Sequence, residues 1–142
     1  MAMRDDDNYV KLSVLASAGL HQVEFAKEQK PVPAHHPRYG NTVAGTPAAR
    51  EGWTWLRLDV RRVDGSERWT AWSSRDGRDW VGGGTWTHRL GPAPRIGLVA
   101  MGGGGRNVTF GPLAVSALRT GALRPPHSAA GKEDASVTVT QP

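Results

Sequence analysis

The sequence predicts an all-β protein built as an antiparallel β-sandwich, and two observations support this. Apolar residues recur at every second position in short runs, which is the period of a strand with one buried face. Turn-forming residues separate these runs, and the 142 residues include 18 Gly and 10 Pro. Because no twelve-residue window keeps a helical apolar period, we expect almost no helix.

Two alternating runs open the chain and predict a hairpin. Val10, Leu12 and Val14 alternate with polar residues in the first run, and His21–Glu28 repeats the pattern in the second. The bend between them is expected at Gly19.

A long connection and a second hairpin follow. Residues 29–52 hold four prolines, so we expect an irregular connection with one short strand at Asn41–Val43. Strands are then predicted for Trp53–Val63 and Glu67–Ser74. The residues between them, Asp64-Gly65, suit a tight hairpin turn because they accept positive φ angles.

The last part of the predicted sandwich is less regular. Weaker strands are expected at Val81–His88, Arg95–Met101 and Asn107–Leu118, with a glycine run before the third. The sequence after Arg119 is small, polar and broken by proline, as in a linker. We therefore divide the chain into a sandwich at 1–118 and a disordered linker or tail at 119–142, whose end, SVTVTQP, resembles the opening strand of a further element.

The stretch SRDGRDW, residues 74–80, is interpreted as a turn rather than a ligand site. Gly77 supplies a residue that tolerates positive φ, and Asp76 is expected to accept hydrogen bonds from the amides of its own turn. Trp80 is expected to fold back and seal the end of the hairpin over the core.

Catalytic, metal and cofactor sites are not expected in this chain. It has no Cys, and its acidic residues lie in turns or on exposed strand faces without a paired arrangement. His35-His36 lacks further ligands nearby for a metal site. The spacing of the acidic cluster DDDN, residues 5–8, differs from that of a calcium loop, so a solvated turn is expected there.

The formal net charge is +5, and 14 of the 18 basic residues are Arg. These arginines are spread along the chain, which favours a solvated surface over a nucleic-acid-binding arm. Nucleic acid is therefore not the expected partner, although a basic sandwich that binds single strands stays an alternative. The amino terminus has no apolar stretch, so neither a signal peptide nor a membrane span is predicted.

The tryptophans supply the candidate binding residues. If Leu56 and Leu58 face the core, then Trp53, Trp55 and Arg57 share the opposite face of their strand. An indole beside polar side chains suits a sugar ring, whose CH face stacks on the aromatic ring. These three residues are the predicted carbohydrate-binding residues. The remaining four tryptophans are expected in the core: Trp69, Trp72, Trp80 and Trp86.

The order of several motifs resembles a known family. WLRLDVRRVDGSERWTAWSSRDGRDW, RIGLVAMGGGG and NVTFGPLAVS follow one another as in the concanavalin A-like, laminin-G-like modules found C-terminally in family-43 glycoside hydrolases and related secreted sugar-active proteins. The resemblance covers about residues 5–118 and implies a jelly-roll sandwich in an extracellular protein.

The chain departs from the family pattern at two places. Gly111-Pro112 stand where the family usually carries an acidic residue and an aromatic residue. In the family a further strand precedes the acidic turn, whereas this sequence begins at the turn, which would leave Tyr9–Leu15 without a neighbour. The resemblance therefore implies an incomplete module, truncated at its amino end.

Taken together, the residues and the resemblance imply a non-catalytic accessory module that contacts glycan and belongs with a missing neighbouring domain. The alternative within the same family is a fragment of a glycoside hydrolase, an arabinofuranosidase or xylosidase, whose catalytic domain is absent. In either reading this chain alone is not expected to be catalytic.

Overall fold

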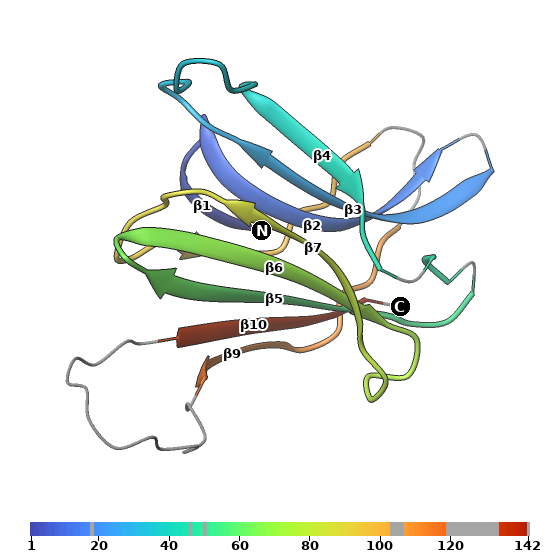
Figure 1. Ribbon diagram of the computed structural model, residues 1–142. Coiled ribbons are helices and arrows are strands. Elements are labelled where there is room, and N and C mark those ends of the chain that lie inside the picture. Colours follow the sequence, from blue (N-terminus) through green and yellow to red (C-terminus); the bar gives the residue numbers. More distant parts are fainter. Residues whose placement is uncertain (18, 46, 50, 103–106, 119–133, 142) are drawn as a thin grey trace.

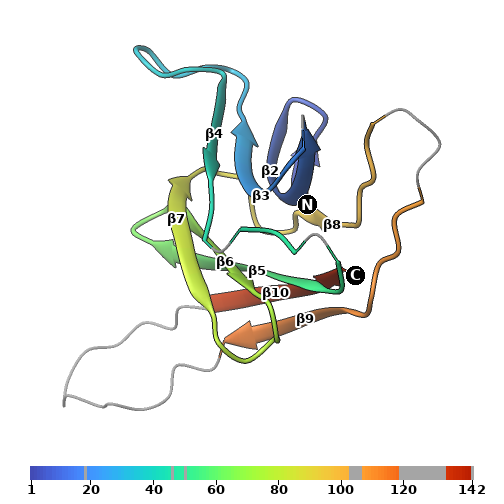
Figure 2. The same ribbon diagram turned by 90° about the vertical axis from the view of Figure 1, so that its right-hand side faces the viewer.

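The protein forms two antiparallel sheets packed face to face (Figures 1 and 2). The computed structural model describes all residues except 18, 46, 50, 103–106, 119–133 and 142. The described residues contain strands and no helix, which confirms the all-β sandwich predicted from the alternating sequence.

The first sheet has the strand order β4-β3-β2-β1-β8. Its strands are β1 (Ala2–Asp5), β2 (Asn8–Ser17), β3 (Leu20–Glu28), β4 (Tyr39–Val43) and β8 (Arg95–Ile96). The predicted first hairpin is confirmed, because β2 and β3 pair continuously from Tyr9↔Glu28 to Ser17↔Leu20. Gly19, at a φ of 79°, lies in the bend between them.

The second sheet has the order β7-β6-β5-β10-β9. Its strands are β5 (Thr54–Val63), β6 (Ser66–Ser74), β7 (Val81–Thr87), β9 (Leu113–Leu118) and β10 (Asp134–Gln141). The predicted hairpin of β5 and β6 is confirmed, and both turn residues, Asp64 at 51° and Gly65 at 76°, have positive φ. Such a pair matches the right-handed twist of the two strands.

The start of the chain differs from the expectation that the acidic turn has only one arm. Ala2–Asp5 forms β1 and pairs antiparallel with β2, from Ala2↔Val10 to Asp5↔Asn8. Its other edge pairs with β8 through Ala2↔Ile96 and Met3↔Arg95. The prediction was wrong because these four residues carry no apolar alternation of their own, and their pairing depends on two separate parts of the chain.

The predicted tail contributes a strand to the sandwich. β10 lies between β5 and β9, with Val137 opposite Leu58 on one side and opposite Val115 on the other. The strand predicted at the end of the chain is thus present, and its partners belong to the same sandwich (Figure 1). Residues 119–133 lie outside the described residues, so the division at 118 stays a prediction.

The hydrophobic core lies between the two sheets. Val10, Val23 and Phe25 enter it from the first sheet, while Leu58 and Trp69 enter it from the second. Alternation along each strand produces this arrangement, as in β5, where buried and partly exposed positions alternate from Thr54 to Val60. The residues on the opposite side of β5 and β6 are therefore directed away from the core.

Candidate functional site: a tryptophan–arginine face

The outward side of β5 and β6 carries a cluster that we call the tryptophan–arginine face, made of Trp55, Arg57, Trp72 and Trp80. In β5 the core takes Leu56 and Leu58, so Trp55 and Arg57 lie on the outward side. The two strands are in register with Arg57 opposite Trp72. Strand pairing therefore brings a cation directly beside an indole.

Arg57 lies between two tryptophans. Its guanidinium carbon is 5.0 Å from the ring centroid of Trp72 and 5.1 Å from that of Trp80. One terminal nitrogen, Nη2, lies 3.2 Å from the Asp59 carboxylate, and the arginine side chain is 29% exposed. Stacking on both rings and the ion pair hold the guanidinium in one orientation, with part of its surface open to solvent.

The turn at residues 74–80 delivers Trp80 to this cluster, and its hydrogen bonds confirm the structural role predicted for Asp76. The carboxylate oxygen Oδ1 of Asp76 accepts from the amides of Arg78 at 2.8 Å and Asp79 at 2.9 Å, and from the Ser74 hydroxyl at 2.9 Å. The amide hydrogen bonds, chiefly that of Arg78, lower the pKa of Asp76 to about 2.

Gly77 has a second role that the sequence did not reveal. Its φ of 74° is the positive value expected for this turn. A Cβ atom at this position would lie 2.9 Å from the Trp55 indole, so only glycine leaves room for the ring. The turn therefore supports one side of Trp55 while it positions Trp80.

The three predicted carbohydrate-binding residues have different surroundings. Trp55 and Arg57 both belong to the face and are half-buried. Trp53 precedes β5 and is 42% exposed. The structure thus places all three at or next to the outward side of one strand, with flat apolar rings beside a charged donor.

Two of the four tryptophans predicted for the core are in the core or packed against it. Trp69 is 1% exposed, and Trp86 packs against the core and donates from Nε1 to the Phe25 carbonyl at 3.2 Å. The prediction for Trp72 and Trp80 was wrong, because both are half-buried on the outward face. The alternation of β6 contained the signal, since position 72 has the opposite parity to Trp69.

Two hydrogen-bond donors lie inside the stack, Arg57 Nε and Trp72 Nε1. Both are covered by neighbouring atoms and make no hydrogen bond with any residue that the structure describes. A buried donor without a partner costs about 1–3 kcal/mol, so the stack loses stability at these two atoms.

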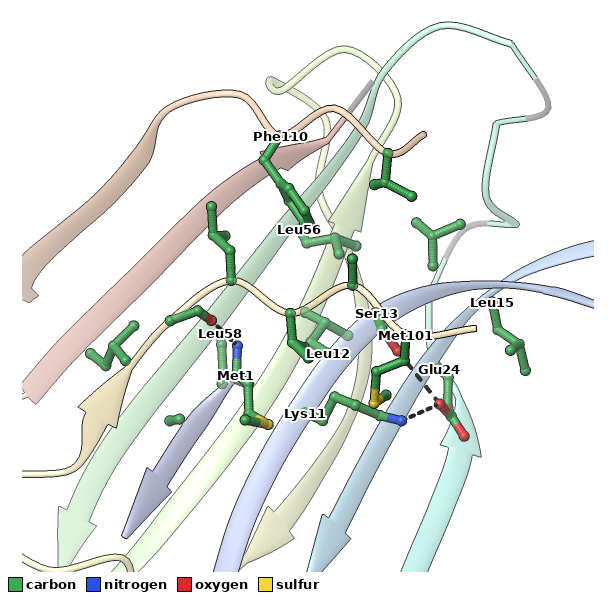
Figure 3. A pocket seen from close by; sticks show the side chains of 18 residues that line it. Met1, Lys11, Leu12, Ser13, Leu15, Glu24, Leu56, Leu58, Met101 and Phe110 are labelled. Carbon is green, nitrogen blue, oxygen red and sulfur yellow. Dashed lines mark hydrogen bonds and ion pairs between the residues drawn. The ribbon is translucent and has the colours of Figure 1, made fainter. Parts of the chain in front are cut away.

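A small pocket between the sheets is more apolar than the tryptophan–arginine face (Figure 3). It has a volume of about 160 Å³, and its walls include Leu12, Leu56 and Phe110. Its charged groups already have partners. Lys11 Nζ lies 3.1 Å from the Glu24 carboxylate, and the N-terminal ammonium of Met1 donates to the Gly97 carbonyl at 2.9 Å. This pocket is an apolar gap next to the core and offers little to a hydroxylated ligand.

The other motifs considered in the sequence are occupied by internal contacts. Asp5 accepts hydrogen bonds from the Asn8 side chain, the Arg4 side chain and the Asp7 amide, which lower its pKa to about 2. His36 Nδ1 contacts the Ala34 carbonyl at 2.9 Å. Among the residues that the structure describes, no three His, Cys, Asp or Glu side chains gather as a metal site would require.

Comparison with known proteins gives no relative on which an assignment could rest. No family model matches the chain, and no curated protein or solved structure matches it significantly. In the part of the chain that the structure describes, no helix is both long and apolar enough to cross a bilayer.

Proposed function

We propose that this chain is a non-catalytic accessory β-sandwich module that binds a neutral glycan on the tryptophan–arginine face. The observation that carries the proposal is the fixed position of Arg57 between Trp72 and Trp80, beside the half-buried ring of Trp55. Sugar rings stack their CH groups on indoles, and their hydroxyls accept hydrogen bonds from a held guanidinium.

Charge balance favours a neutral ligand at this face. Asp59 lies 3.2 Å from Arg57 and offsets its charge, so the guanidinium between the two indoles is a paired cation. The exposed Arg61 and Arg68 lie opposite each other further along the same side of β5 and β6, outside the face. A protein that tracks the backbone of single-stranded nucleic acid would instead need a positively charged groove beside its aromatic residues. Glycan is therefore the preferred ligand class, and single-stranded DNA is the competing outcome of the test.

The biological context of the proposal comes from the sequence resemblance. The motifs between residues 5 and 118 resemble the concanavalin A-like jelly-roll modules of family-43 glycoside hydrolases, which implies an extracellular protein with a catalytic neighbour. In that setting the module would hold a partner domain near its polysaccharide. The alternative is that the chain is a fragment of an arabinofuranosidase or xylosidase whose catalytic domain is missing.

The test is retention of the purified chain on neutral polysaccharides. We expect retardation on arabinan or xylan in affinity electrophoresis, with little change between low and high salt, because a neutral sugar releases no counterions. Trp55→Ala should weaken binding about tenfold or more, as expected for an aromatic contact near the centre of a binding surface.

Tyr39→Ala is the matched control. Tyr39 is 58% exposed and lies 5.1 Å from the Arg38 guanidinium, so it forms a similar aromatic–arginine pair on the other sheet. This variant should bind as well as the wild type. The proposal is wrong if no neutral polysaccharide retards the chain, if both variants lose binding equally, or if only single-stranded DNA binds with a steep salt dependence.

A further inference from the structure

A second cavity is lined by residues at the ends of β3 and β7 and in the segments that follow them. Its volume of about 450 Å³ is within the usual range of about 300–1,000 Å³ for small-molecule sites. β1, β3 and the segments after β3 and β7 all contribute to its wall, and it lies apart from the tryptophan–arginine face.

The wall of this cavity is basic. It includes Arg4, Lys27, Lys30 and Arg89, together with two histidines, and none of its residues is acidic. Two of these cations already have carboxylate partners, because Asp5 pairs with Arg4 and Asp7 pairs with Lys30. Glu28 pairs with Arg38, and Glu67 accepts from the amides of Leu90 and Gly91. A negatively charged ligand would therefore be attracted chiefly by Lys27 and Arg89.

Lys27 is a buried cation that pairs with no carboxylate in the described part of the chain. Only 9% of the residue is exposed, and its ammonium contacts the Thr87 carbonyl at 3.2 Å, the Gln29 side-chain oxygen at 3.5 Å and the Trp86 ring at 5.3 Å. Burial lowers the pKa of Lys27, because the charged form is removed from water. A bound carboxylate would supply the missing partner.

His88 supplies an unused hydrogen-bonding atom on the same wall. The residue is 5% exposed, and its Nε2 has no hydrogen-bond partner among the residues that the structure describes. Burial and then the charge of Lys27 lower its pKa, while its hydrogen bond to the Glu28 backbone opposes this. The lowered pKa favours the neutral ring, and Nε2 is available to form a hydrogen bond with a ligand hydroxyl.

We propose that this cavity binds a hydroxylated carboxylate of the uronic-acid kind, whose carboxylate pairs with Lys27 and whose hydroxyl forms a hydrogen bond with His88 Nε2. Arg4 and Arg89, both exposed at the cavity, attract the anion from solvent. The inference does not depend on the function proposed for the tryptophan–arginine face, because the two sites share no residue.

Two-dimensional NMR or calorimetric titration of the whole chain with glucuronate tests the proposal. Glucuronate should bind and perturb the His88 and Trp86 signals, whereas glucose, which lacks the carboxylate, should not. Acetate and inorganic phosphate, which lack the ring hydroxyls, should bind at least about tenfold more weakly. A short oligouronide distinguishes a free acid from a glycan residue as the source of the ligand.

Substitutions of residues in the cavity test where glucuronate binds. Lys27→Met should weaken glucuronate binding about tenfold or more, and His88→Phe should remove the advantage of glucuronate over acetate. Lys11→Met removes a lysine of the neighbouring strand that lies in the apolar pocket, and it should bind normally. If Lys27→Met does not fold, the exposed double variant Arg4→Gln, Arg89→Gln replaces it and should also bind more weakly.

Three results would each overturn the inference. They are the absence of glucuronate binding at millimolar concentration, equal binding of glucose, and affinity that is unchanged in both Lys27→Met and the double variant. Phosphate binding tighter than glucuronate would also contradict it, since that would assign a simple oxyanion site without use of His88 Nε2.

Discussion

Single positions decide which side of the sandwich each tryptophan occupies. Trp69 and Trp72 lie on one strand, yet the first is 1% exposed in the core and the second stacks on Arg57 outside it. Residue type alone predicts a buried site for both. Their parity in the strand separates them, and the contact with Trp80 depends on a turn whose path the sequence does not specify.

The burial of Lys27 could have been predicted from the alternation of its strand. Val23, Phe25 and Lys27 have the same parity in β3, and all three are buried. A lysine that continues an apolar alternation is a marker of a buried charge, which is rare without a partner. His88 could not be found in this way, because it lies beyond β7 and is buried by contacts distant in the sequence.

Gly77 yields the sharpest prediction for stability. Gly77→Ala should lower the free energy of unfolding by about 2–4 kcal/mol, because the positive φ costs about 1–2 kcal/mol and the new Cβ would press on Trp55. Chemical denaturation monitored by tryptophan fluorescence measures this loss.

Gly65→Ala is the control for that substitution. Gly65 has a nearly identical φ of 76°, but no atom lies within 4 Å of a Cβ placed there. It should therefore lose only the backbone contribution, about 1–2 kcal/mol. Equal losses in the two variants would show that Gly77 does not support the Trp55 ring.

The turn between β6 and β7 predicts a stability change with pH. The pKa of Asp76 is about 2 in the folded protein and 3.8 ordinarily, so its stabilising effect is present above pH 3.8 and is lost as the pH falls to about 2. Asp76→Asn should therefore show a smaller loss of stability than the wild type over this range. Urea unfolding at pH 2, 3 and 4 provides the comparison, and parallel profiles for the two proteins would contradict it.

Strands whose own sequence alternates between apolar and polar residues could be predicted. Strands that form only by pairing with distant segments of the chain could not. The hairpins of β2 with β3 and of β5 with β6 follow from local periodicity and a turn with positive φ. β8, in contrast, is only Arg95–Ile96, where the sequence suggested a strand up to Met101. Such short edge pairings depend on where β1 lies, which no local pattern encodes.

In the whole molecule, the two ends of the chain complete different sheets. β1 joins the first sheet between β2 and β8, while β10 joins the second between β5 and β9. These pairings connect residues far apart in the sequence, so periodicity could predict the strands but not their order. Two candidate sites follow from this arrangement, a neutral aromatic face on one sheet and a basic cavity at the end of the sandwich.

The position of Arg57 is the feature on which the proposed glycan-binding face depends, and nuclear Overhauser spectroscopy of the uniformly labelled chain measures it directly. Close contacts should connect the Arg57 side chain to the indole protons of both Trp72 and Trp80, with its methylene signals shifted upfield by the two rings. Contacts from Arg57 to core residues such as Val23 or Phe25 would place it between the sheets and contradict the account.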